Sequence, residues 1–229
     1  AQQIPFYQMV HDSILNGDTM WSYTTDLGAN LVGSYSFYLM GSPFFWITLL
    51  FPSSFVPYLM APLLILKFGF ASLTAYIFLK RYVSNKGFAV LGGLLYAFSG
   101  FSLYNVFFNH FHEAIIIFPL LLYAIDEYMY NKRKGIVALA VFGSCVLNYY
   151  FFVGQVVFVI IYWVIRVATK TYPKINFTEL LFLTFQVIIG FLMTFVILLP
   201  SILSVIQNNR LDTWPEGWNA ILYDVNQRY

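Results

Sequence analysis

Long apolar runs separated by short polar or basic segments make up the chain from residue 56 to residue 206. A helix needs about 20 mainly apolar residues to cross the hydrocarbon core of a bilayer. The apolar stretch from Ile136 to Ala168 is too long for one such span, and the polar interruption Asn148–Tyr150 divides it into a hairpin. The pattern therefore predicts six apolar segments: Val56–Leu79, Gly87–Phe108, Ala114–Tyr130, Ile136–Leu147, Phe151–Ala168 and Leu180–Ile206.

The first limb of this hairpin, Ile136–Leu147, is too short to cross about 30 Å of hydrocarbon comfortably. We expect it to sit against other parts of the protein, beneath a cavity that opens outward. The sixth segment carries Pro200 near its end.

The composition agrees with a bilayer as solvent. The chain is 60% hydrophobic and only 10% charged, whereas a soluble domain carries about 25% charged residues. Lipid tails accept apolar side chains on the outside of a protein. The prediction is an all-α polytopic membrane protein, with about six transmembrane helices of the required length.

Two function classes are excluded or weakened by the same counts. A net charge of +2 is too weak and too scattered for nucleic-acid binding. The single cysteine, Cys145, lies in an apolar run, so it forms no disulfide within the chain and no thiolate metal site. Its expected place is a buried one.

The basic residues predict the orientation. Nine of the twelve fall in three connections or at the helix ends beside them, and loops rich in Lys and Arg face the cytoplasm. The opposite, extracellular side then holds all three histidines and most of the acidic residues. The segments expected there are 1–55, 109–113, 148–150 and the tail from residue 207.

Three regions follow from this pattern. Residues 1–55 are predicted to be an external loop with interfacial helices along the outer leaflet, because Tyr35–Phe51 is rich in aromatic residues. Residues 56–206 form the helix bundle, and residues 207–229 begin a further external segment. Because the chain starts at Ala1 without Met, we expect it to be a piece of a longer protein.

Several stretches resemble one family in the same order. "WSYTTDLGANLVGSYSFYLMGSPFFWI" is similar to the first extracellular loop of bacterial YfhO-type membrane proteins, and "LLILKFGFASLTAYIFLKRY" is similar to the span that follows it. "GGLLYAFSGF", "FNHFHEAIIIFPLLLYAIDEY" and "NYYFFVGQVVFVIIYWVIR" resemble the succeeding spans. The resemblance implies a GT-C-like helix bundle and a membrane glycosyltransferase. Its implied reaction moves a sugar from undecaprenyl phosphate to an extracellular cell-envelope polymer such as lipoteichoic acid.

The resemblance also implies where the catalytic base should lie. Enzymes of this class place an acidic residue at the start of the first external loop, and only the tail of the family's "D…Q…F" pattern, Gln3 and Phe6, is present here. This departure favours a base upstream of residue 1 and an inactive chain on its own. Within the chain, the candidates for a catalytic role are Asp26, Asp12 and His11.

The chemistry of such a transfer explains these choices. A carboxylate must accept the proton of the acceptor hydroxyl, and the phosphate leaving group needs a cation, a metal or oriented donors. Asp26 lies in "TDLGAN", where Gly28 permits a tight turn and Asn30 adds an amide that could bind substrate. An Asp that only supports its own turn fits equally well. The sequence fixes no metal ligands, and a divalent cation stays open.

The turn "NHFHE" must lie at the external membrane boundary, close to a lipid phosphate. Its substrate-binding candidates are Asn109, His110, His112 and Glu113. Alternating histidines are a weak metal signal. A purely structural turn is the competing interpretation.

Lys67 is the sharpest single candidate, because an ionisable side chain deep in a span is costly and usually functional. We expect it to reach the outer cavity and the donor phosphate. The alternative is a lysine paired or bonded inside the protein. Tyr149 and Tyr150, beside Asn148 and Gln155, are further candidates for sugar contacts.

Two other functions stay open. A transporter or flippase of an anionic lipid-linked substrate should carry polar groups at depth and on both sides, often with discontinuous helices. A scaffold without catalysis is the third interpretation.

Overall fold

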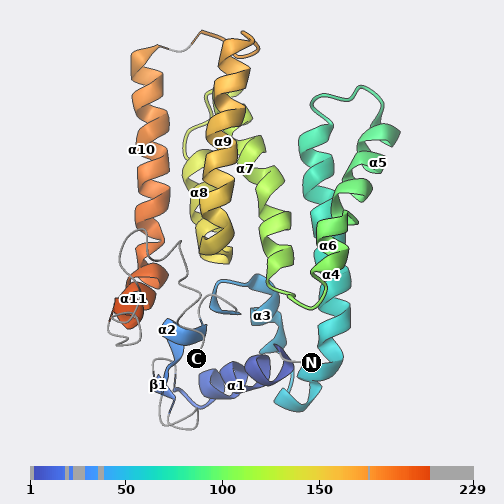
Figure 1. Ribbon diagram of the computed structural model, residues 1–229, viewed down its shortest axis with the longest axis vertical. Helices are drawn as coiled ribbons and strands as arrows, with labels where there is room; N and C mark the ends of the chain where they lie inside the picture. Colours follow the sequence, from blue (N-terminus) through green and yellow to red (C-terminus); the bar gives the residue numbers. More distant parts are fainter. Residues whose placement is uncertain (1–2, 19–20, 23–28, 36–38, 175, 207–229) are drawn as a thin grey trace, which may run out of the picture.

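The computed structural model covers residues 1–229 and describes all of them except 1–2, 19–20, 23–28, 36–38, 175 and 207–229. Helices make up most of the described residues. In chain order the main helices are α4 (Val56–Leu79), α5 (Lys86–Ala97), α6 (Gly100–Tyr104), α7 (Phe111–Asn131), α8 (Ile136–Leu147), α9 (Tyr149–Ala168), α10 (Phe177–Met193) and α11 (Phe195–Ile206). They form an elongated bundle (Figure 1).

A smaller layer built from the first part of the chain lies across one end of this bundle (Figure 1). This N-terminal layer contains α1 (Gln3–Leu15), a two-residue antiparallel pairing of β1 (Trp21–Ser22) with β2 (Ala29–Asn30), α2 (Leu31–Tyr35), α3 (Pro43–Thr48) and the 3-10 turn η2 (Ser53–Phe55). The α4–α5 and α9–α10 connections lie at the opposite end, which we call the basic end.

Local signals in the sequence explain most helix boundaries. The side chain of Asn148 accepts a hydrogen bond from the backbone nitrogen of Phe151 and so begins α9. Asn176 and Glu179 form a capping box at the start of α10. At the end of α7, Lys132 takes the left-handed conformation that closes a helix.

The predicted boundaries of α4 and α8 are confirmed, and those of α7 and α9 are close. Two predicted segments are broken. The segment Gly87–Phe108 is interrupted between α5 and α6 around Ser99, and Leu180–Ile206 bends by 56° between α10 and α11.

Among the residues that the structure describes, three helical stretches are long and apolar enough to cross a membrane: Ser53–Leu79, Lys86–Tyr104 and Tyr149–Ala168. The bent pair α10 and α11 gives a fourth if it is one broken span. The all-α membrane fold is therefore confirmed, but the count of six spans is not. The division at residues 55 and 206 stays a prediction.

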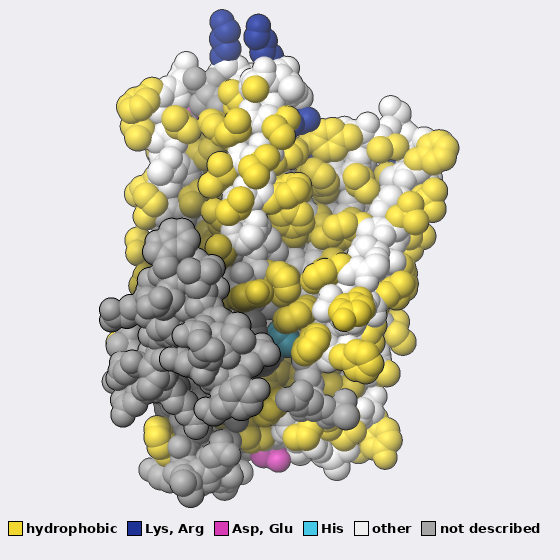
Figure 2. Space-filling view, in the orientation of Figure 1, with side chains coloured by type: hydrophobic (Ala, Val, Ile, Leu, Met, Phe, Trp, Pro, Cys, Tyr) yellow, Lys and Arg dark blue, Asp and Glu magenta, His cyan; other side chains and the backbone are white. Residues whose placement is uncertain are grey.

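The sides of the bundle are apolar. Figure 2 shows hydrophobic side chains along the length of the helices, with Lys and Arg at the basic end. On α9, for example, the side chains of Val153, Ile160 and Ile161 are all more than half exposed. Such a surface suits lipid rather than water.

The short helix α8 sits against other parts of the protein, as its length suggested, although Leu139 is exposed. It packs against α7, α9 and α10. Its contact with α10 is so close that a Cβ atom at Gly190 would overlap the carbonyl oxygen of Ala138, and a Cβ at Gly41 would overlap that of Val146 at its end. Residues of the N-terminal layer therefore abut the end of α8. Cys145, in the same helix, is buried and free as predicted.

Candidate functional site

A fully buried ion pair joins the middle of α4 to the start of α7. Lys67 has no exposed surface, and its Nζ lies 2.6 Å from Oε1 of Glu113. The same ammonium group donates a hydrogen bond of 3.0 Å to the backbone carbonyl oxygen of Asn109. The hydroxyl of Ser42 donates to the same carboxylate oxygen at 2.5 Å. These four residues form the Lys67 network.

Each partner is placed by its own element. Glu113 lies in the first turn of α7, where the helix dipole favours a negative charge. Ser42 is the N-cap of α3, and its Oγ accepts a hydrogen bond of 3.2 Å from the backbone nitrogen of Phe45. A hydroxyl can donate once and accept twice. Ser42 therefore caps the start of α3 and binds the carboxylate at the same time.

The sequence left two interpretations of Lys67 open, a donor-phosphate partner and a lysine bonded inside the protein. The contacts that it makes are those of the second. Its Nζ also lies 5.2 Å from the ring centre of Phe44, so protein surrounds the charge. Contact with a phosphate stays a prediction.

Gln3 ties the N-terminal layer to the turn before α7. Its Oε1 accepts from the backbone nitrogen of Asn109 at 3.1 Å, which fixes the orientation of the amide. Its Nε2 therefore donates to Nδ1 of His110 at 2.8 Å. Since Nδ1 accepts, a neutral His110 carries its proton on Nε2. Burial, with the charge of Lys67 and the neighbouring His112, lowers the pKa of His110 to about 4.

The second histidine of the turn points elsewhere. Nε2 of His112 lies 3.0 Å from the carbonyl oxygen of Ser102 in α6, and its ring packs edge-on against Phe68. His110 and His112 are thus held by different elements. Within the described part of the chain, no three His, Cys, Asp or Glu side chains are grouped to hold a metal ion.

The other predicted site residues are scattered. His11 is buried, and its Nε2 lies 2.9 Å from the carbonyl oxygen of Phe51, while its Nδ1 lies 3.3 Å from the exposed carboxylate of Asp12. Asn30 accepts from the backbone nitrogen of Gly33 at the start of α2. Asp26 lies outside the described residues, so its predicted role has no structural counterpart.

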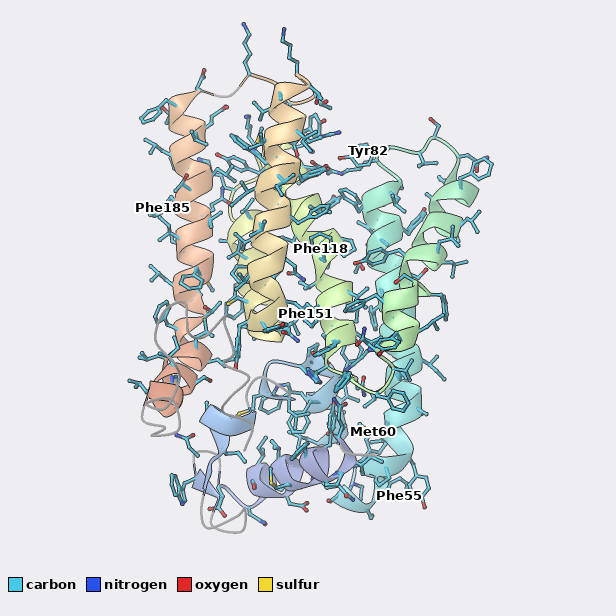
Figure 3. All side chains as sticks on the ribbon, in the orientation of Figure 1. Phe55, Met60, Tyr82, Phe118, Phe151 and Phe185 are labelled. Atoms are coloured by element: carbon cyan, nitrogen blue, oxygen red, sulfur yellow. The ribbon has the colours of Figure 1, made fainter. Side chains whose placement is uncertain are left out.

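The predicted polar residues at the start of α9, which we call the polar island, are partly buried. Asn148 and Gln155 are buried, Tyr149 is half-buried and Tyr150 is exposed. Nε2 of Gln155 donates to the carbonyl oxygen of Ala114 at 3.0 Å, one residue beyond Glu113. The island therefore lies next to the first turn of α7. Figure 3 shows Phe151, in the same turn of α9, near that end of α7.

Tyr7 was missed by sequence reasoning. It is buried on α1 with its ring edge-on to Phe45, and burial with the charge of Glu113 raises the pKa of its hydroxyl. One tyrosine among eighteen carries no signal of its own. Ser42 could have been found, because Ser followed by Pro is a helix-start signal.

A second polar network lies at the basic end. Asp126 of α7 is fully buried and accepts hydrogen bonds from the hydroxyls of Tyr82, Tyr162 and Tyr172. Arg166 donates to the hydroxyls of Tyr82 and Tyr130. Figure 3 labels Tyr82, which lies beyond the end of α4 and points toward α9.

An apolar-sided helix bundle that encloses charged networks near both ends defines a polytopic membrane protein. The family described as bacterial membrane protein YfhO matches residues 1–221, and the chain belongs to it. The chain matches no curated protein and no solved structure.

Proposed function

We propose that this YfhO-family chain acts in a membrane glycosyltransferase that moves a sugar from undecaprenyl phosphate to an extracellular polymer such as teichoic acid. The observation that carries the proposal is the family membership over residues 1–221. The helical membrane fold and the Lys67 network beneath the N-terminal layer support it.

The reaction needs one bond to form and one to break. The acceptor hydroxyl gives its proton to a carboxylate while its oxygen attacks the anomeric carbon of the sugar. The bond from that carbon to the phosphate oxygen breaks, and the phosphate leaves with the electron pair. Donors around the phosphate stabilise the transition state. Asp26 and Asp12 are the proposed bases within this chain.

We assign the Lys67 network a positioning role in this reaction. Lys67 and Glu113 neutralise each other and are closed to solvent. By binding the carbonyl oxygen of Asn109, Lys67 fixes the turn that carries His110. The side chains of Asn109, His110 and His112 are buried as well. Substrate contacts in this proposal therefore fall first to Tyr150 at the start of α9, which is exposed.

A transfer assay tests the proposal. Membranes that contain the protein are mixed with labelled undecaprenyl-phosphate sugar and a teichoic acid acceptor, and label in the polymer is measured. Asp26→Asn and Asp12→Asn should each be compared with Asp18→Asn, an acid beside the turn at Asn16–Gly17. Replacing the catalytic base should lower the transfer rate at least about 100-fold. Equal transfer in all three variants would show that neither Asp26 nor Asp12 is the base. No transfer by the full protein would contradict the proposed activity itself.

Orientation has its own test. With Cys145 replaced, a cysteine at Asn16 should react with an impermeant thiol reagent in intact cells, and a cysteine at Lys174 should not. The reverse labelling would place the candidate site inside the cell.

Two observations favour a second candidate, a transporter or flippase of an anionic lipid-linked substrate. The bundle contains a helix pair bent by 56° and polar networks toward both ends, which are features of transporters. Vesicles with fluorescent polyprenyl-phosphate sugar separate the two. Movement between leaflets without label in the acceptor would favour transport.

A further inference from the structure

A groove between α9 and α10 opens at the basic end. The two helices run side by side (Figure 1), and both pack on α8. A cavity of about 780 Å³ lies between them, with apolar walls from Trp163, Val167, Phe177 and Leu180. A second cavity of about 320 Å³ shares Trp163 and Leu180 and reaches Val159 and Val187. The two cavities therefore form one groove.

The groove has the depth of one leaflet. Val167 and Val159 are about eight residues apart on α9, which corresponds to about 12 Å at 1.5 Å per helical residue. The hydrocarbon core is about 30 Å thick, so half of it is about 15 Å. An acyl chain of one leaflet matches this length.

The mouth of the groove is cationic. Lys170 and Lys174 line the larger cavity, above its apolar walls. Neither forms an ion pair within the described part of the chain, in contrast to Lys132, whose Nζ lies 2.8 Å from the carboxylate of Glu179. Figure 2 shows Lys and Arg side chains standing beyond the apolar surface at this end.

The neighbouring charged residues do not neutralise the positive charge at the mouth of the groove. On an adjacent face of α9, the Arg166 guanidinium lies against the rings of Tyr82, Tyr162 and Tyr172. Asp126 is fully buried beneath tyrosine hydroxyls. A phosphate at the mouth would thus meet two ammonium groups that no described carboxylate pairs with, and a third cation lies nearby.

We propose that this groove binds an anionic glycerophospholipid of the leaflet at the basic end. One acyl chain lies between α9 and α10, and the headgroup phosphate binds Lys170 and Lys174. Basic pockets between membrane helices bind anionic headgroups in this way. A zwitterionic lipid would gain less, because its own cation would oppose the two lysines. The site is separate from the proposed sugar transfer and does not depend on it.

Photo-crosslinking in vesicles tests both place and charge. The full protein is reconstituted with phosphatidylglycerol that carries a diazirine on its acyl chain, and the labelled peptides are mapped. Label should concentrate on the facing residues of α9 and α10 near Val159 and Val187, and excess unlabelled phosphatidylglycerol should compete better than phosphatidylcholine. Label spread evenly over the lipid-facing helices, or equal competition by both lipids, would overturn the proposal.

Two pairs of variants separate charge from shape. Lys170→Gln with Lys174→Gln should weaken retention of phosphatidylglycerol by about 30-fold, at about fivefold for each lysine near the surface. The charge-matched control, Lys80→Gln with Lys86→Gln, should retain it. Val167→Trp should fill the groove and lose the lipid with both lysines in place, whereas Ile165→Trp, on another face of α9, should not.

Native mass spectrometry of the detergent-released protein measures this retention, and size-exclusion chromatography confirms that each variant is folded. Equal loss in Lys170→Gln/Lys174→Gln and in its control would reduce the effect to general surface charge. Retention in Val167→Trp would show that the groove is not the binding site. Either result contradicts the proposal.

Discussion

The Lys67 network and the network around Asp126 each stabilise a buried carboxylate, but they do so in different ways. In the first, an ammonium and a carboxylate touch directly with no exposed surface. In the second, tyrosine hydroxyls stand between the buried carboxylate of Asp126 and the partly exposed guanidinium of Arg166. A direct buried pair fixes the position of its elements, because neither charge can be left alone. In the second network the guanidinium of Arg166 keeps partial exposure and donates to tyrosine hydroxyls instead of to the carboxylate.

This contrast predicts that the Lys67 network is the more fragile. Lys67→Met leaves the carboxylate of Glu113 buried without its cation, and we expect a loss of about 3–5 kcal/mol in the free energy of unfolding. From the sequence alone, Lys67→Met would be expected to leave stability unharmed, since an apolar residue suits a membrane span. Thermal unfolding in detergent measures the loss. Lys67→Met combined with Glu113→Gln should recover most of it, and a double variant as unstable as the single one would show that the pair is not coupled.

The pH dependence of the same region sharpens the comparison. Burial lowers the pKa of His110 to about 4, below the ordinary value of about 6.5. The unfolded chain therefore takes up the proton first as the pH falls. Stability from this group is complete above pH 6.5 and is lost between pH 6.5 and 4, with a fall in Tm on the order of 4 °C.

The control for this prediction is His110→Gln, which removes the titrating ring. Its Tm should change less than that of the unaltered protein between pH 6.5 and pH 4. Identical pH profiles of the two proteins would contradict the lowered pKa.

A smaller effect ranks the tyrosines around Asp126. Tyr172 is buried and Tyr82 is half-exposed, and both donate to the carboxylate. Tyr172→Phe should cost about 1–2 kcal/mol, because a hydrogen bond to a charged group is lost without water to replace it. Tyr82→Phe should cost less, since water can reach that side. Thermal unfolding of the two variants side by side gives the order, and the reverse order would contradict it.

The smallest effect belongs to the open ion pair between Lys132 and Glu179. Both side chains are partly exposed, at 38% and 29%, and exposed pairs contribute little. Lys132→Gln should therefore leave the Tm unchanged within error at moderate salt. A shift as large as that of Lys67→Met would show that exposure does not separate the two kinds of pair.

Much of the fold could be predicted from the sequence because its signals are local. The bounds of α4 and α8, and the division of the long apolar stretch at Asn148, follow from apolar length and from one capping residue. The bend between α10 and α11 was missed, since Thr194 interrupts an apolar run without any change in its pattern. The candidate site was predicted in part: Lys67, Gln3 and the turn 109–113 were found, but Ser42 and Tyr7 were not singled out.

The sequence by itself determined that the protein lies in a bilayer, where most of its helices run and to which family it belongs. Apolar composition and segment length can be read from the order of residues along the chain alone. Only the tertiary structure decided which charges meet. Lys67 pairs with Glu113 of another helix, and the three hydroxyls on Asp126 come from residues 36 to 46 positions away along the chain. Such partners are chosen by how the helices pack, since a buried charge takes whichever opposite charge or donor the packing brings within reach.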